Sequence, residues 1–159
     1  MTIVTTLPMK EAAWRKLSGA EKLVGAGFRA WMAGYNTQDI GSWEACWNEY
    51  STELGPRGAK QAIADLSYWV RTVKEHTARK IETFPNGCSG FCKDECLAVS
   101  VVAACQHKHC PALQICAAEL IGTQETDRMI ETAEGFAYTL SQLDIHLGRN
   151  SVDSLANVA

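Results

Sequence analysis

The feature of this sequence that most constrains its fold is a repeating apolar pattern between residues 57 and 79. Its apolar members are Ala59, Ala62, Ile63, Leu66, Trp69, Val70 and Val73. Because these residues recur at intervals of three or four residues, they all lie on one face of an α-helix, and the charged residues between them lie on the opposite face. A helix with one apolar face must bury that face against another element, so we expect the chain to fold as packed helices.

Further helices are predicted on both sides of this one. Helical spacing or helix boundary signals predict additional helices over residues 18–35, 43–54, 91–106, 111–121 and 124–147. Gly55 and Pro56 separate two of the helices, because proline cannot continue the hydrogen-bond ladder of a helix. We therefore predict an all-α fold, a single-domain bundle of five or six helices with a central apolar helix around residues 91–106. Residues 1–8 are predicted to form a loose N-terminal arm, and residues 149–159 a frayed tail.

Length and charge exclude several classes of protein. A chain of 159 residues fits one domain and needs neither a disulfide nor a metal to fold. The net charge of −3 is not the positive overall charge that is typical of a nucleic-acid-binding domain. The longest apolar run, residues 97–105, is far shorter than the roughly 20 residues that cross a bilayer. The N-terminus lacks the pattern of a secretory signal peptide, so we expect a soluble, cytoplasmic protein that inserts into no membrane.

The unusual local feature is a cysteine-rich stretch. Six of the seven cysteines lie between residues 85 and 116, together with His107 and His109. In a reducing compartment, cysteines favour metal binding, thiol chemistry or core packing over a disulfide framework. The odd number of cysteines agrees with this, because at least one thiol stays unpaired in a monomer.

The first hypothesis is a metal or iron–sulphur centre with a sensing, carrier or structural role. Thiolate and imidazole groups are ligands that zinc prefers, and about four thiolates hold an iron–sulphur cluster. The spacing of the cysteines matches neither the usual pairs of zinc ligands nor the ferredoxin patterns. The candidate ligands are Cys88, Cys92, Cys96, Cys105, His107, His109 and Cys110.

The second hypothesis is a thiol redox protein that uses Cys88 and Cys92 as a reactive pair. Both residues fall near the predicted start of a helix, where the exposed N–H groups favour a thiolate. This hypothesis predicts a lowered pKa for Cys92. The chain contains no phosphate-binding loop, dinucleotide fingerprint, serine elbow or histidine-pair metalloprotease motif, which mildly favours a non-enzymatic role. Any catalysis would be that of a thiol-based oxidoreductase.

The third hypothesis is a protein-interaction module in which the cysteines only pack. Free cysteine often behaves as a small buried hydrophobe, and apolar or aromatic neighbours surround Cys46, Cys96, Cys105 and Cys116. Aromatic residues concentrate between residues 28 and 69, and tryptophan and tyrosine are favoured where a surface is both apolar and hydrogen-bonding. An aromatic surface of this kind would bind a protein partner or a second copy of the chain. The basic face of the helix predicted over residues 57–79 is the alternative surface for a protein partner.

Overall fold

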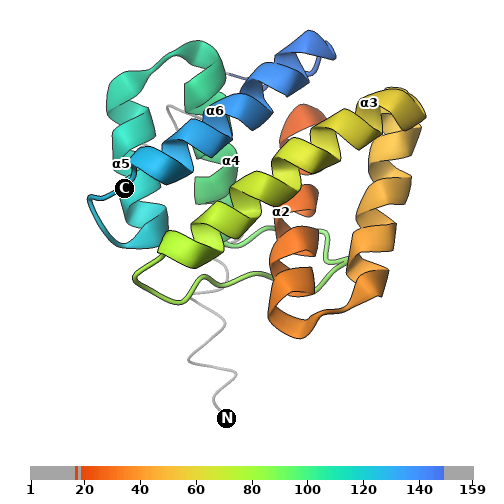
Figure 1. Ribbon diagram of the computed structural model, residues 1–159, viewed down its shortest axis with the longest axis horizontal. Coiled ribbons are helices and arrows are strands. Elements are labelled where there is room, and N and C mark those ends of the chain that lie inside the picture. Colours follow the sequence, from red (N-terminus) through yellow and green to blue (C-terminus); the bar gives the residue numbers. More distant parts are fainter. Residues whose placement is uncertain (1–16, 18, 149–159) are drawn as a thin grey trace.

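The structure, a computed structural model, describes residue 17 and residues 19–148 of the chain. These residues form five α-helices and no β-strand, which confirms the predicted all-α class. The helices, labelled as in Figure 1, are α2 (Gly19–Thr37), α3 (Ile40–His76), α4 (Lys93–His107), α5 (Cys110–Ile121) and α6 (Asp127–Gln142). The arm predicted for residues 1–8 and the tail predicted for residues 149–159 lie outside the described residues.

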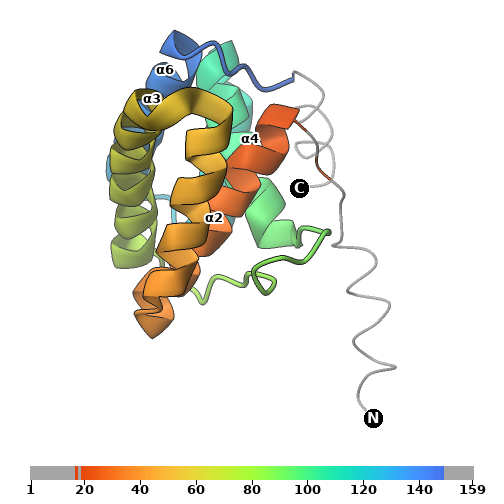
Figure 2. The same cartoon turned by 90° about the vertical axis from the view of Figure 1, so that its right-hand side faces the viewer.

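Helix α3 contains the break predicted at Gly55 and Pro56. Gly55 has φ 78° and ψ 161°, a backbone conformation that is essentially restricted to glycine. The helix therefore consists of a first arm, residues 40–54, and a second arm, residues 56–76, which join at a sharp bend (Figure 2). The bend allows two helices that are consecutive in the sequence to run in different directions.

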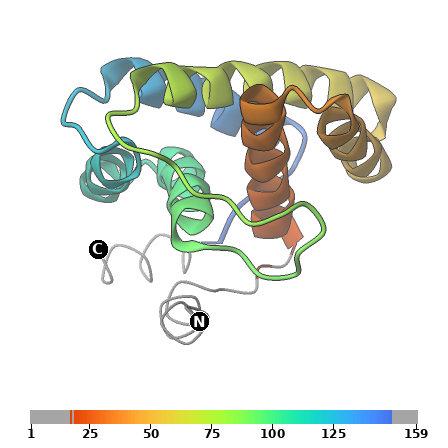
Figure 3. The ribbon, with the colours of Figure 1, turned by 90° about the horizontal axis from the view of Figure 1, so that it is seen from below.

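The helices form two crossing layers. Seen from below, the second arm of α3 and α6 lie along one side (Figure 3). Beneath them, α4 and α5 are viewed nearly end-on, and α2 runs obliquely down from the second arm. Trp69 of the second arm is fully buried between the layers. The centroid of its ring lies 5.4 Å from the ring centroid of Phe28 on α2 and 5.7 Å from the ring centroid of Phe136 on α6. The apolar face predicted for residues 57–79 thus contacts helices of both layers.

Two glycines of α2 allow close packing. A Cβ atom on Gly25 would lie 3.0 Å from the ring of Phe91, and one on Gly27 would lie 2.8 Å from a methyl group of Leu66. Each glycine lowers helix propensity by up to about 1 kcal/mol relative to alanine. The close approach of neighbouring side chains explains why this cost is tolerated.

Helix α4 is the helix predicted around residues 91–106. It begins at Lys93, with Cys92 as its N-cap residue, and ends at His107. Every residue from Asp94 to Ala104 is buried. No helix in the described part of the chain is both long enough and apolar enough to cross a bilayer.

The last helix is shorter than the apolar pattern predicts. The pattern extends to residue 147, but α6 ends at Gln142, and Asp144 adopts a φ of 64°. Gln106 of α4 explains the difference, because its amide nitrogen donates to the carbonyl oxygen of Ile145 and its amide oxygen accepts the N–H of Leu147. These bonds satisfy backbone groups that a continued helix would have used.

Candidate functional site

The cysteine- and histidine-rich segment does not form one cluster, because α4 separates its two halves. Cys92 is the N-cap residue of α4, and Cys105 lies in its last turn. At about 1.5 Å per residue, the two positions are about 20 Å apart along the helix. Of the seven cysteines, the structure buries Cys46, Cys92, Cys96 and Cys116, half-buries Cys105, and exposes Cys88 and Cys110. The two groups of candidate ligands therefore do not meet.

At the N-terminal end of α4, the environment of Cys92 opposes thiolate formation. The side chain is only 6% exposed, and its Sγ donates to the carbonyl oxygen of Glu82 at 3.3 Å. Burial, and then the charge of Glu95, raises the pKa of Cys92 to about 12. The lowered pKa predicted for a reactive Cys92 is therefore wrong, because burial and a carboxylate outweigh the favourable helix N-terminus.

That carboxylate belongs to a buried ion pair. Arg29 of α2 and Glu95 of α4 have side chains that are 3% and 0% exposed. Two guanidinium nitrogens lie 2.7 and 2.9 Å from the two carboxylate oxygens. The pair also binds backbone groups that precede α4, namely the carbonyl oxygens of Cys88 and Gly90 and the N–H groups of Phe84 and Cys92. The network holds residues 77–92, hereafter the connecting segment, against α2 and α4.

A second ion pair fixes the other part of the connecting segment. Nη2 of Arg79 lies 3.0 Å from one carboxylate oxygen of Asp94 and 2.9 Å from the other. Asp94 also accepts the N–H of Glu82, and Arg79 donates to the carbonyl oxygen of Leu120. The two acidic residues in the first turn of α4 thus anchor a long irregular segment.

At the C-terminal end of α4, both histidines bind backbone groups. Nε2 of His107 lies 2.8 Å from the carbonyl oxygen of Leu147, so this nitrogen carries a proton and donates it. His109 is the N-cap residue of α5, and its Nδ1 accepts the N–H of Ala112. A neutral imidazole has one acceptor nitrogen, and His109 already uses it. Both residues therefore have a structural role at the junction of α4 and α5.

The described residues contain no assembled set of metal ligands. Nowhere among them do three histidine, cysteine, aspartate or glutamate side chains lie where they can share one ion. A structural zinc site and an iron–sulphur cluster each need about four ligands. The seven residues proposed as ligands instead divide between the two ends of α4.

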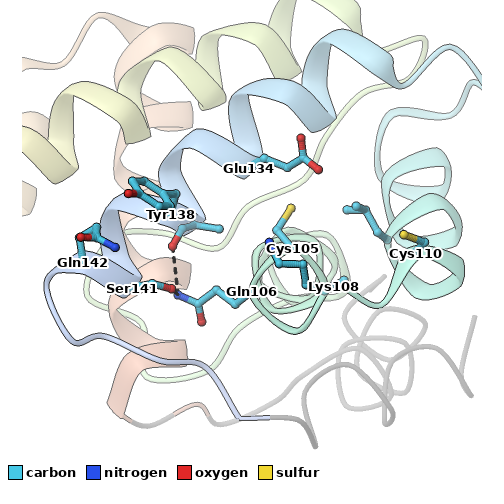
Figure 4. Close-up of a pocket in the computed structure, with 11 residues that line it drawn as sticks. Cys105, Gln106, Lys108, Cys110, Glu134, Tyr138, Ser141 and Gln142 are labelled. Atoms are coloured by element: carbon cyan, nitrogen blue, oxygen red, sulfur yellow. Dashed lines mark hydrogen bonds between the residues drawn. The ribbon is translucent and has the colours of Figure 1, made fainter.

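A cavity of about 560 Å³ opens beside the C-terminal end of α4 (Figure 4). Cys105 and Lys108 lie on one side of it, Cys110 of α5 on another, and Glu134 of α6 above them. Leu113 of α5 also lines the cavity. Burial, and then the charge of Glu134, raises the pKa of the Cys105 thiol to about 12. The apolar neighbours of Cys105 in the sequence predict a core position, but the residue is half-buried and lines this cavity.

A second hollow, the tryptophan cleft, lies where α2 meets the two arms of α3. It has a volume of about 490 Å³ and is lined by Trp31, Trp43, Glu44, Trp47, Asn48 and Ile63. The rings of Trp31 and Trp43 stack with their centroids 5.0 Å apart. Trp47 is 40% exposed at the surface of the first arm. Three tryptophans thus form an aromatic wall that solvent reaches.

The sequence signals for these features differ in strength. The concentration of aromatic residues, with Trp43 and Trp47 four residues apart, indicates an aromatic surface. Arg29 stands among apolar residues of α2 without a motif, and nothing in the sequence links Lys108 to Glu134. The chain matches no family model, no curated protein and no solved structure.

Proposed function

We propose that this protein is a non-catalytic interaction module whose tryptophan cleft binds a basic, partly apolar segment of a partner protein. The observation that carries the proposal is the combination of accessible tryptophan and several acidic residues, without any basic residue of its own, on the first arm of α3. Residues 38–56 contain no lysine or arginine. Their acidic residues are Asp39, Glu44, Glu49 and Glu53.

The apolar part of the cleft has the character of a protein-binding hot spot. Tryptophan is enriched among residues that dominate binding energy, especially where it fills or lines a pocket. Trp31 and Trp43 pack against each other and are half-buried, so they form a wall that is ordered before a partner arrives. A wall of this kind lowers the entropy cost of binding. Trp47 and Ile40, which is 64% exposed, add accessible apolar surface on the same arm.

The charge of the arm selects a basic partner. Glu44 lines the cleft beside the tryptophans, and no cation of the first arm balances it. A lysine or arginine of the partner can pair with Glu44 and lie over an indole face, and a cation–π contact contributes about 0.5–1 kcal/mol at an exposed site. Negative charge around a binding surface also speeds the approach of a positively charged partner.

The cysteines are not needed for this function. Cys46 lies on the first arm but is 3% exposed, and burial raises the pKa of its thiol to about 12. Cys96 and Cys116 are also buried in the helices that carry them. Their placement agrees with packing, and the proposal needs neither a metal nor a reactive thiol.

Selection from a random peptide library displayed on phage tests the proposal, because such a library samples many partner sequences at once. The selected peptides are expected to combine lysine or arginine with aliphatic or aromatic residues. A selected peptide, labelled for fluorescence anisotropy, should lose at least tenfold in affinity with Trp47→Ala, because hot-spot tryptophans contribute about 2 kcal/mol or more. Charge reversal by Glu44→Lys should weaken the same peptide, more strongly at low salt than at high salt.

Matched variants on other surfaces serve as controls. Tyr138→Ala removes an aromatic side chain that is 65% exposed on α6, and Glu125→Lys reverses an exposed charge outside the cleft. Neither variant should change the affinity. Selected peptides that are acidic, or that bind the Trp47→Ala variant as tightly as the parent protein, would contradict the proposal.

A further inference from the structure

We propose that the cavity at the C-terminal end of α4 binds a small zwitterion of amino-acid or dipeptide size, with the ligand's ammonium group at Glu134 and its carboxylate at Lys108. Different helices line this cavity and the tryptophan cleft. The ligand site is therefore independent of the function proposed above.

Two opposite charges at the cavity have no ion-pair partner among the described residues. Within that part of the chain, neither Glu134 nor Lys108 pairs with the other or with any further residue. Both charges nevertheless act on the thiol of Cys105, Glu134 by raising its pKa and Lys108 by lowering it. The carboxylate and the ammonium group therefore belong to the lining of the same cavity, and both lie near enough to the Cys105 thiol to affect its ionisation. A ligand with one charge of each sign satisfies both groups.

The rest of the lining suits a ligand with polar ends and an aliphatic side chain. Tyr138 and Gln142 follow Glu134 at intervals of four residues, which places the three side chains along one face of α6. The phenol of Tyr138 and the amide of Gln142 form no hydrogen bond within the described residues, so they are available to a ligand. Leu113 and two alanines supply an apolar wall. The volume of about 560 Å³ lies within the usual range of small-molecule sites.

The floor of the cavity is ordered before any ligand binds. The amide nitrogen of Gln106 donates to Ser141 Oγ and to the carbonyl oxygens of Ala137 and Ile145, and its amide oxygen accepts the N–H of Leu147. In Figure 4, Gln106 and Ser141 lie close together below Tyr138 and Glu134. Because these bonds connect α4 to α6 and to the residues after it, the two walls keep their spacing. A preformed site loses less entropy on binding.

The test is an NMR titration of the ¹⁵N-labelled protein with the dipeptide alanyl-leucine. Saturable shift changes are expected at the amides of the residues that line the cavity. N-acetyl-alanyl-leucine lacks the ammonium group and alanyl-leucine amide lacks the carboxylate. Each analogue should bind about three- to fivefold more weakly, as expected for the loss of one solvent-accessible ion pair.

Variants assign each end of the ligand to one residue. Glu134→Gln should weaken the free dipeptide about three- to fivefold without weakening the acetylated one further, and Lys108→Gln should behave in the same way towards the amidated one. Glu125→Gln and Lys60→Gln, exposed positions outside the cavity, are matched controls that should change nothing. Absence of saturable shifts, shifts centred outside the cavity, or equal affinity for all three compounds would overturn the proposal.

Discussion

Replacement of Arg29 by methionine is expected to destabilise the protein more than any loss of a surface ion pair. The substitution keeps an unbranched apolar stem but removes the guanidinium group. Glu95, whose side chain is 0% exposed, then remains buried without its cation. The carbonyl oxygens of Cys88 and Gly90 lose their donors as well.

The magnitude follows from the burial of the pair. Removal of one partner of a buried ion pair costs about 3–5 kcal/mol, because the remaining charge has no compensation. The N–H groups of Phe84 and Cys92 still bind the Glu95 carboxylate, which favours the lower part of that range. The guanidinium also lies 4.3 Å from the centre of the Phe91 ring, and that contact is lost. Since domains unfold with about 5–15 kcal/mol, Arg29→Met should remove a large part of the stability.

Urea denaturation followed by circular dichroism measures this loss, and Arg71→Met is the matched control. Arg71 and Glu75 form a pair four residues apart whose side chains are 63% and 56% exposed, so breaking it should cost only about 0.3–0.5 kcal/mol. Hydrogen exchange gives a local readout, because the amide of Phe84 should lose protection in Arg29→Met and keep it in the control. If both variants lose the same small amount of stability, the assignment of Arg29 as an anchor of the connecting segment is refuted.

Three further predictions concern the backbone and the thiols. Gly55→Ala should lower the free energy of unfolding by about 1–3 kcal/mol, because alanine does not tolerate φ 78° with ψ 161°. Gly135→Ala inside α6, where a Cβ meets no atom within 4 Å, should raise the free energy of unfolding by about 0.5–1 kcal/mol. Urea denaturation measures both changes. Maleimide labelling read by mass spectrometry should modify the exposed Cys88 and Cys110 before the buried Cys92, and equal rates would contradict the burial described. Folding raises the pKa of Cys92 to about 12, whereas an unfolded thiol ionises near pH 8.5–9. The stability that the protonated thiol contributes is therefore complete below about pH 9 and is lost as pH rises towards 12. Denaturation at several pH values should show a shallower alkaline decline in the free energy of unfolding for Cys92→Ala than for the parent protein.

The helices and several of their boundaries could be predicted because their causes are local. The apolar spacing around Trp69 predicts a helix whichever partner buries it. Gly55 and Gly122 adopt positive φ where the sequence places a helix break and a helix end, and Pro111 lies in the first turn of α5. Each of these signals depends on backbone conformation within a few residues.

The candidate site could be predicted only in part, because proximity of its residues depends on packing. The sequence groups Cys92 with Cys105 by their nearness along the chain, whereas a buried helix holds them apart. In the opposite sense, Arg29 and Glu95 are 66 positions apart and form the most deeply buried ion pair of the described residues. The sequence around a hydrogen-bonding residue does not indicate which distant residue it pairs with.

The sequence by itself determined an all-α protein, the bend in α3 and a chain rich in cysteine and tryptophan. Only the tertiary structure decided what those residues do. It buries most of the thiols, binds His107 and His109 to the backbone, and ends α6 early through the side chain of Gln106. It also opens the tryptophan cleft and brings Glu134 and Lys108 into the lining of one cavity. The physical reason is that helix formation responds to neighbours along the chain, whereas burial and charge pairing respond to neighbours in space.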